Sequence, residues 1–172
     1  MAKDMVIMKY YKLQKKCLIN NQKMKSELEK YLNEIANSNV TYSRAGGGAG
    51  CVILIKFEKQ NLIYSMFINC AWRIEMGDKV ITTSADDTTA KTGPMAKGVR
   101  LLEGLKVLSI NMSKFYDLSI KFENNIFLNV FCDITPTNIL LSSQNWDLSV
   151  IKEDLSFEIS PNFEIKRGKY YS

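Results

Sequence analysis

The sequence predicts an α+β fold in which an N-terminal amphipathic helix packs on a mostly antiparallel, meandering β-sheet. The chain has 172 residues, 46% of them hydrophobic and 24% charged, a composition typical of a globular domain with a full hydrophobic core. Apolar residues recur at helical spacing before about residue 37 and alternate with period two after about residue 40. We therefore expect one domain over residues 1–172. It has a helical segment at about 5–37 and a β-rich body at about 40–167 that forms a partly closed barrel or a sandwich.

The helix is predicted by five apolar side chains at helical spacing: Met24, Leu28, Tyr31, Leu32 and Ile35. Charged residues fill most of the positions between them, which is the pattern of a helix with one buried face. Asn20 and Asn21 suit the position that caps a helix, so a shorter helix or strand is expected before them.

The first hairpin is predicted from the segment NLIYSMFINCAWRIEM, residues 61–76. Its apolar side chains alternate onto one face, namely Tyr64, Met66, Ile68, Cys70, Trp72, Ile74 and Met76. A Gly-Asp pair follows and suits a two-residue turn, after which KVITTS returns. Counting back from this turn places Arg73 opposite Thr82 and Asn69 opposite Asp86.

The second hairpin and the remaining strands follow from the same alternation. The segments DLSIKFE and IFLNVFCD flank Asn124-Asn125, a residue type that tolerates positive φ. KVLSINM precedes this hairpin, and NWDLSVI, LSFEIS and FEIKRG follow it as a meander. Residues 85–103 fit either a surface loop or a short helix.

The run Gly46-Gly47-Gly48-Ala49-Gly50 resembles the loops that wrap phosphates, but its surroundings do not. A P-loop needs a Lys-Ser/Thr pair after its last glycine, and it joins a strand to a helix. Here Cys51 comes next, and the order is loop and then strand. We therefore expect a flexible or bulged connection that leads into a strand over 51–57.

A polar cluster around the first hairpin is the candidate site. Its role is either to bind a partner or to stabilise the fold. Its members are Arg44, Asn69, Arg73, Ser84, Asp86 and Asp87. An arginine–carboxylate pair with hydroxyl neighbours can hold an anion or a partner's side chain, but more often such a pair stiffens a sheet. We expect the structural role, in which Arg73→Ala costs about 2–4 kcal/mol because Asp86 loses its partner. Glu153 and Asp154 form a second candidate, an acidic patch for a partner.

The residue types argue against catalysis. The chain has no histidine, which removes the usual general base near neutral pH and the commonest metal ligand. Four widely spaced cysteines are expected to be buried free thiols rather than zinc ligands or disulfides: Cys17, Cys51, Cys70 and Cys132. We expect no catalytic residue, no cofactor and no metal. An enzyme that uses carboxylates, Lys91 or Lys97 is the competing possibility.

The net charge of +5 comes mainly from lysines, several of them crowded into residues 9–30. A basic segment of this kind can bind nucleic acid, so a nucleic-acid-binding module is the alternative function. No apolar run reaches the roughly 18 residues needed to cross a bilayer, and the N-terminus has no apolar secretory region. We therefore expect a cytoplasmic protein without membrane contact.

The segment FINCAWRIEMGDKVITTSADD resembles a hairpin of the pattern C-x-W-R-I…I…S-x-D in a group of small, largely uncharacterised bacterial proteins. Their later pattern L-x-G-x-x-V…D-L-x-I-x-F…L-x-x-F matches Leu102, Gly104, Val107, Asp117, Leu118, Ile120, Phe122, Leu128 and Phe131, and the tryptophan of NWDLSV fits too. The resemblance covers about residues 44–150. Where we expect a histidine ahead of the Cys-x-Trp-Arg run, this chain has Ile68 and Asn69.

The resemblance implies a component of toxin–immunity or other bacterial conflict loci, and therefore a non-enzymatic, immunity-type inhibitor. Its partner would be a protein, the cognate toxin or effector. A toxin that attacks nucleic acid has a basic cleft, so its inhibitor needs an acidic patch. Asp86, Asp87, Glu153 and Asp154 are the candidates for that patch.

Overall fold

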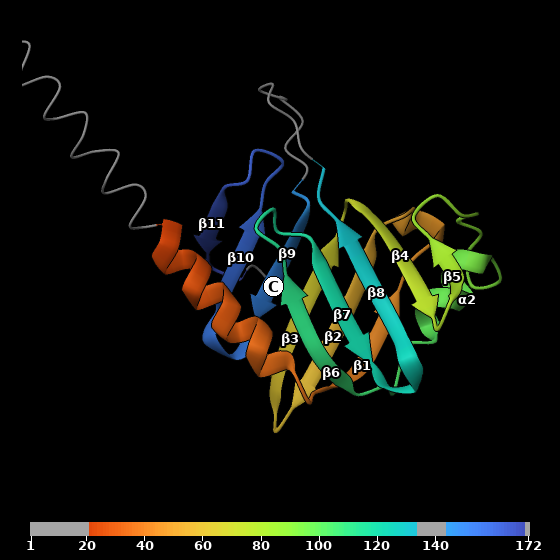
Figure 1. The fold of residues 1–172 in the computed structure, drawn as a ribbon, viewed down its shortest axis with the longest axis horizontal. Helices are drawn as coiled ribbons and strands as arrows, with labels where there is room; N and C mark the ends of the chain where they lie inside the picture. Colours follow the sequence, from red (N-terminus) through yellow and green to blue (C-terminus); the bar gives the residue numbers. More distant parts are fainter. Residues whose placement is uncertain (1–20, 134–143, 171–172) are drawn as a thin grey trace, which may run out of the picture.

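Two antiparallel β-sheets lie one on the other in the computed structural model, which describes residues 21–133 and 144–170 (Figure 1). Sheet A has the order β1-β2-β3-β9-β10-β11, and sheet B has the order β5-β4-β8-β7-β6. The strands of sheet A are β1 (Asn39–Arg44), β2 (Ile53–Lys59), β3 (Leu62–Ile68), β9 (Trp146–Val150), β10 (Leu155–Ile159) and β11 (Ile165–Gly168). Those of sheet B are β4 (Ala71–Met76), β5 (Lys79–Thr83), β6 (Val107–Met112), β7 (Leu118–Phe122) and β8 (Ile126–Phe131).

One hydrophobic cluster joins the two sheets. The alternating apolar side chains of both sheets enter it, so each strand turns one face inward and one outward. Two buried indoles also link the layers. Trp72 Nε1 donates a hydrogen bond to the carbonyl of Cys51 at 2.7 Å, and Trp146 Nε1 donates to the carbonyl of Tyr116 at 2.9 Å. The two sheets are therefore held together by apolar burial and by directional bonds.

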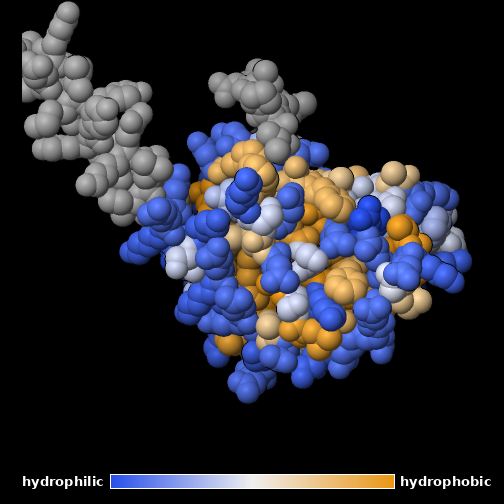
Figure 2. Space-filling view, viewed as in Figure 1, coloured by the Kyte–Doolittle hydropathy of each residue, from blue (hydrophilic) through white to orange (hydrophobic). Residues whose placement is uncertain are grey.

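Residues 21–35 form a helix beside β10 and β11, with hydrophilic side chains on its solvent side (Figures 1 and 2). Its apolar stripe is buried, and Leu28 and Ile35 have no exposed surface. The ring of Tyr31 lies 5.7 Å from the ring of Phe157 on β10. The part of the predicted helical segment that precedes residue 21 lies outside the described residues.

The region 85–103 contains both a loop and a short helix, α2 (Pro94–Arg100). Proline in the first turn suits a helix start because its missing N–H has no partner there. Met95 and Val99 are buried, so α2 covers the edge of the core beside β1 and β5.

The predicted strand segments and the C-terminal meander β9-β10-β11 are confirmed. Of the two predicted architectures, the partly closed barrel is wrong, and the two stacked sheets correspond to the sandwich. Neither sheet closes on itself: β1 and β11 are the edges of sheet A, and β5 and β6 are the edges of sheet B. Within the sheets, β3 pairs with β9 and β4 pairs with β8 across long stretches of chain. The segment 61–76 is not one strand, since Asn69 and Cys70 cross from sheet A to sheet B. The second predicted turn is confirmed, with φ of 59° and 57° at Asn124 and Asn125.

Three of the four cysteines fall in the described part of the chain, and they are free thiols: Cys51, Cys70 and Cys132. Cys70 is buried and the other two are partly buried, while Cys17 lies outside the described residues. Over residues 21–133 and 144–170, no helix combines the length and the apolar character needed to cross a membrane.

Candidate functional site

Arg73 does not meet Asp86, and this part of the predicted polar cluster is wrong. A β-bulge beside the turn shifts the predicted register by one residue, so Arg73 lies opposite Thr83. Its Nε donates to the carboxylate of Glu75 on the same strand. Its guanidinium lies 5.3 Å from the ring centre of Phe131, and 43% of the side chain is exposed. The ion pair is therefore a surface pair.

Asp86 and Ser84 instead close the end of β5. One carboxylate oxygen of Asp86 accepts hydrogen bonds from the hydroxyl of Thr82 and from the backbone N–H of Thr83, both at 2.8 Å. The hydroxyl of Ser84 accepts a hydrogen bond from the backbone N–H of Trp72 at 3.3 Å. These bonds fasten the strand end, which is a structural task.

The other members of the predicted cluster lie apart from one another. Asp87 accepts hydrogen bonds from the hydroxyl and the backbone N–H of Thr89, and these bonds lower the pKa of its carboxyl group. Asn69 lies at the crossing between the sheets, where its backbone N–H donates to the carbonyl of Asn145. Arg44 ends β1 at the edge of sheet A. The six residues do not form one site.

The predicted acidic patch is partly engaged by the helix at 21–35. The hydroxyl of Tyr31 donates to the carboxylate of Glu153 at 2.5 Å. Burial raises the pKa of Tyr31, and the bond to Glu153 raises it further. Asp154, with a φ of 50°, closes the turn between β9 and β10. Glu153 therefore fastens the helix to this turn.

A pair of carboxylates that the sequence analysis did not single out lies on the outer face of sheet A. Asp147 on β9 and Glu158 on β10 are directly opposite each other in the strand register, an arrangement that destabilises a sheet when the charges are alike. Burial raises the pKa of Asp147 to about 6, and the charge of Glu158 acts in the same direction. Lys166 on β11 lies 3.3 Å from Glu158. This cation pairs with Glu158, and a second lysine, Lys169, lines the groove beside the pair.

The carboxylate pair borders a groove of about 360 Å³. Its lining consists of Phe67, Gln144, Asp147, Ser149, Ser156, Glu158, Lys169 and Tyr170. Ser149 and Ser156 pair across β9 and β10. Their side chains are small and fill little of the groove. Phe67 on β3 pairs with Asp147 and is 40% exposed. An exposed aromatic ring therefore stands beside a half-buried carboxylate.

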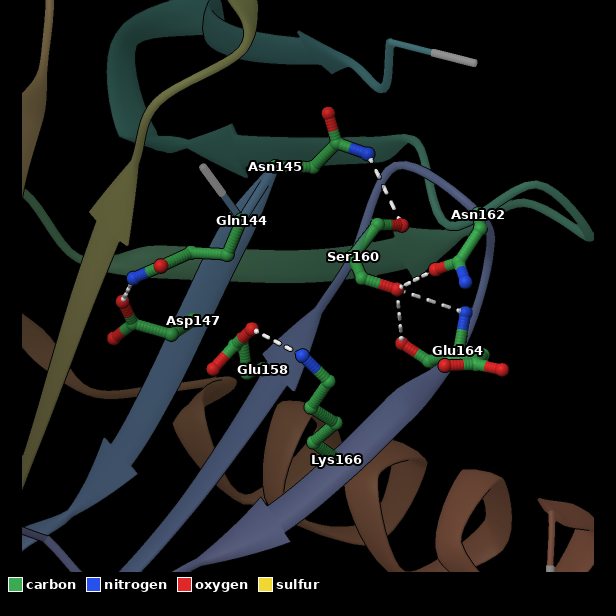
Figure 3. A network of polar contacts seen from close by, with 8 residues as sticks. All are labelled: Gln144, Asn145, Asp147, Glu158, Ser160, Asn162, Glu164 and Lys166. Atoms are coloured by element: carbon green, nitrogen blue, oxygen red, sulfur yellow. Dashed lines mark hydrogen bonds and ion pairs between the residues drawn. The ribbon is translucent and has the colours of Figure 1, made fainter. Parts of the chain in front are cut away.

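Hydrogen bonds at one end of the groove fix its shape (Figure 3). Gln144 Nε2 donates to Asp147 at 2.8 Å. Asn145 is 2% exposed, and its Nδ2 donates to the carbonyl of Ser160 at 3.5 Å. The hydroxyl of Ser160 donates to the side chain of Asn162. The start of β9 and the end of β10 are thereby tied together, which sets the position of Asp147.

The sequence carries a partial signal for this pair. Asp147 and Glu158 stand within the alternating runs NWDLSV and LSFEIS, and acidic residues are uncommon in strands. Both occupy outward positions, and the turn at 151–154 sets them opposite each other. No local pattern predicts that Phe67 and Tyr170 border the same groove, because they come from distant parts of the chain.

The groove has the chemistry to receive a cationic side chain. An ammonium or guanidinium group placed at Asp147 and Glu158 would make charge-assisted hydrogen bonds, and partial removal from water strengthens such bonds. The ring of Phe67 offers a face that attracts cations. Among the described residues, no three acidic or cysteine side chains gather into a metal site.

Comparisons of this chain with protein-family models, with curated proteins and with solved structures find no match.

Proposed function

We propose that this chain is a non-enzymatic, cytoplasmic binding protein that inhibits a basic protein partner, as an immunity protein inhibits its toxin. The groove on sheet A receives a lysine or arginine of that partner between Asp147 and Glu158. The observation that carries the proposal is the direct opposition of these two carboxylates on an outward face. They destabilise the free protein, and a partner's cation would relieve that repulsion.

The surroundings of the carboxylate pair support a protein partner. Phe67 and Ile63 on β3 are 40% and 36% exposed, and apolar side chains around a few polar groups are typical of protein interfaces. The groove of about 360 Å³ lies near the lower limit of small-molecule sites. One long side chain inserted from a facing surface fits that size.

The class of partner follows from charge. A toxin that cleaves or modifies nucleic acid carries a basic cleft, because it must attract phosphates. An inhibitor that blocks such a cleft presents acidic groups to it. Asp147 and Glu158 replace Asp86, Asp87 and Glu153 as the acidic groups of the proposal, because they lie opposite each other beside a groove. Asp86, Asp87 and Glu153 instead bind Thr82, Thr89 and Tyr31 at separate places in the fold.

Capture from a cell lysate with matched baits tests the proposal. The baits are the wild type, the groove variant Asp147→Asn/Glu158→Gln, and a control variant Asp78→Asn/Glu29→Gln that removes the same two charges from exposed positions outside the groove. We expect the wild-type and control baits to capture one basic protein, and we expect the groove variant to capture none of it. The gene for that protein should neighbour the gene for this chain and encode a secreted protein with a toxic C-terminal domain.

Two outcomes would contradict the proposal. The first is a protein that all three baits capture equally, because the groove would then have no part in its binding. The second is nucleic acid on the wild-type bait that leaves as the salt concentration rises, which would favour the alternative function.

A further inference from the structure

A second pocket lies at the opposite edge of sheet A, between the end of β1, the loop before α2, and α2 itself. Its volume is about 300 Å³. The lining comprises Tyr42, Ser43, Arg44, Ala45, Gly46, Ala90, Lys91, Ala96, Arg100 and Glu103. Ser43, Ala45, Gly46 and Ala96 are buried and form its base. The charged residues are exposed and stand around its rim.

The rim carries an excess of positive charge. Arg44, Lys91 and Arg100 come from three different elements, and none of them makes an ion pair within residues 21–133 and 144–170. Glu103 is the one carboxylate in the lining, and its Oε1 already accepts a hydrogen bond from the backbone N–H of Ser43 at 3.0 Å. The lining thus contains three cationic side chains and one carboxylate, and that carboxylate is already hydrogen-bonded within the chain.

The glycine run shapes this pocket without supplying its polar groups. Gly46 has a φ of 80°, and a Cβ there would lie 3.1 Å from the carbonyl oxygen of Thr88. Its N–H donates to the carbonyl of Gly50 at 2.8 Å, and the N–H of Gly47 donates to the carbonyl of Thr88 at 2.5 Å. The loops at 46–50 and 88–92 therefore dock closely, and these amides are already bonded within the chain. An anion in the pocket would be held by side chains.

We propose that this pocket binds a phosphate dianion, with the guanidinium groups of Arg44 and Arg100 as its main ligands and Lys91 as a third positive charge. Guanidinium groups match the oxygens of a phosphate in pairs. A dianion balances the two positive charges that remain after Glu103 is counted. The phosphate is either free or part of a small phosphate ester. This site is separate from the groove at Asp147.

Calorimetric titration of the full chain with inorganic phosphate, adenosine 5′-monophosphate and acetate tests the proposal. We expect both phosphate probes to bind saturably at neutral pH and acetate to bind at least tenfold more weakly. Tighter binding of the nucleotide than of inorganic phosphate would identify an ester as the ligand, whereas equal affinities would identify free phosphate. Affinity for the nucleotide should fall severalfold at about one pH unit below its second pKa of about 6, because the dianion takes up a proton.

Variants locate the binding. Arg44→Gln/Arg100→Gln should raise the Kd for phosphate at least tenfold, while Lys97→Gln, on an exposed position of α2 outside the lining, should leave it unchanged. Both positions of the double variant are exposed, so its melting temperature should stay near that of the wild type. Unchanged affinity in the folded double variant, or acetate binding as tight as that of phosphate, would overturn the proposal. Neither result bears on the groove, because the partner is not used.

Discussion

Asp147 carries its charge in surroundings that disfavour it, since it is half-buried and faces Glu158. Its pKa of about 6 in the folded protein lies above the value of about 3.9 of a free aspartate. Between these values the folded state holds a proton that the unfolded state has lost. The stability that Asp147 contributes is therefore greatest below about pH 4 and falls as the pH rises to about 6.

Asp147→Asn should therefore stabilise the protein at neutral pH, by about 1–3 kcal/mol. The gain should shrink toward about pH 4, where the wild-type carboxyl group is itself neutral. Urea unfolding of both proteins across this pH range measures the difference. Asp78→Asn, at an exposed turn, is the control and should follow the wild type. A gain that does not change with pH would mean that Asp147 titrates like a free aspartate.

Arg73 and Asp86 test the register of the first hairpin. Arg73→Ala should cost less than about 1 kcal/mol, because its ion pair with Glu75 is exposed. Asp86→Ala should cost about 1–2 kcal/mol, because the hydroxyl of Thr82 and the N–H of Thr83 lose their acceptor. The two costs should add in the double variant, since the side chains share no contact. Coupling above about 0.5 kcal/mol in thermal unfolding would instead support the register counted from the sequence.

At the scale of elements, α2 rests on β5 through Gly98. A Cβ at Gly98 would lie 2.3 Å from Cγ2 of Thr82. Thr82 is 1% exposed and its hydroxyl is bound to Asp86, so it has little room to move. Gly98→Ala should therefore destabilise the protein by about 1–3 kcal/mol, although alanine forms helices better than glycine by about 1 kcal/mol. Denaturant unfolding measures the cost.

Thr82→Ser provides the matched background for this test. It removes Cγ2 and keeps the hydroxyl that donates to Asp86. Gly98→Ala should cost at least about 1 kcal/mol less in this background than in the wild type, because the two residues are in contact. Equal costs in both backgrounds would show that Cγ2 of Thr82 does not limit position 98, because Cβ of residue 82, at 2.8 Å, is present in both.

The individual strands are predictable from sequence because alternation with period two is a local property. Their pairing is not, because β3 and β9 lie about 80 residues apart and no local pattern links them. The segment 61–76 shows the difference. Its even-numbered side chains point inward on both sides of Cys70, where the chain passes from sheet A to sheet B. Two strands in two sheets therefore give one unbroken alternating pattern in the sequence. The β-bulge between Ile74 and Glu75 likewise leaves no mark in the alternation.

At the scale of the whole molecule, the net charge of +5 does not show how the charges are grouped: a basic pocket lies at the edge strand β1, and an opposed carboxylate pair lies on β9 and β10. Arg44, singled out from the sequence, belongs to the basic pocket with Arg100. Asp147 and Glu158 were visible in the sequence as acidic residues in strands, but their functional interest depends on burial. That burial comes from the packing of distant segments around the groove, which a single sequence does not specify.

The alternative function also makes a whole-molecule prediction. If the lysine-rich segment at 9–30 binds nucleic acid, affinity should fall steeply with salt and should weaken when Lys12, Lys15 and Lys16 become glutamine. These three lysines lie outside the described residues. In the described part of the segment, Lys30 pairs with Glu34 at 3.5 Å. We expect no binding to duplex or single-stranded nucleic acid at low salt, measured by fluorescence anisotropy with a basic nucleic-acid-binding protein as positive control.

Calorimetry of complex formation with the captured partner tests the central claim most directly, because it counts protons at Asp147. At about pH 6 the free groove holds about half a proton, and a cation seated at Asp147 expels it. The heat of binding should then depend on the ionisation enthalpy of the buffer at pH 6, lose that dependence at about pH 8, and lose it at both pH values in Asp147→Asn. A heat of binding that is the same in all buffers, with equal affinity for the wild type and for Asp147→Asn/Glu158→Gln, would contradict the claim.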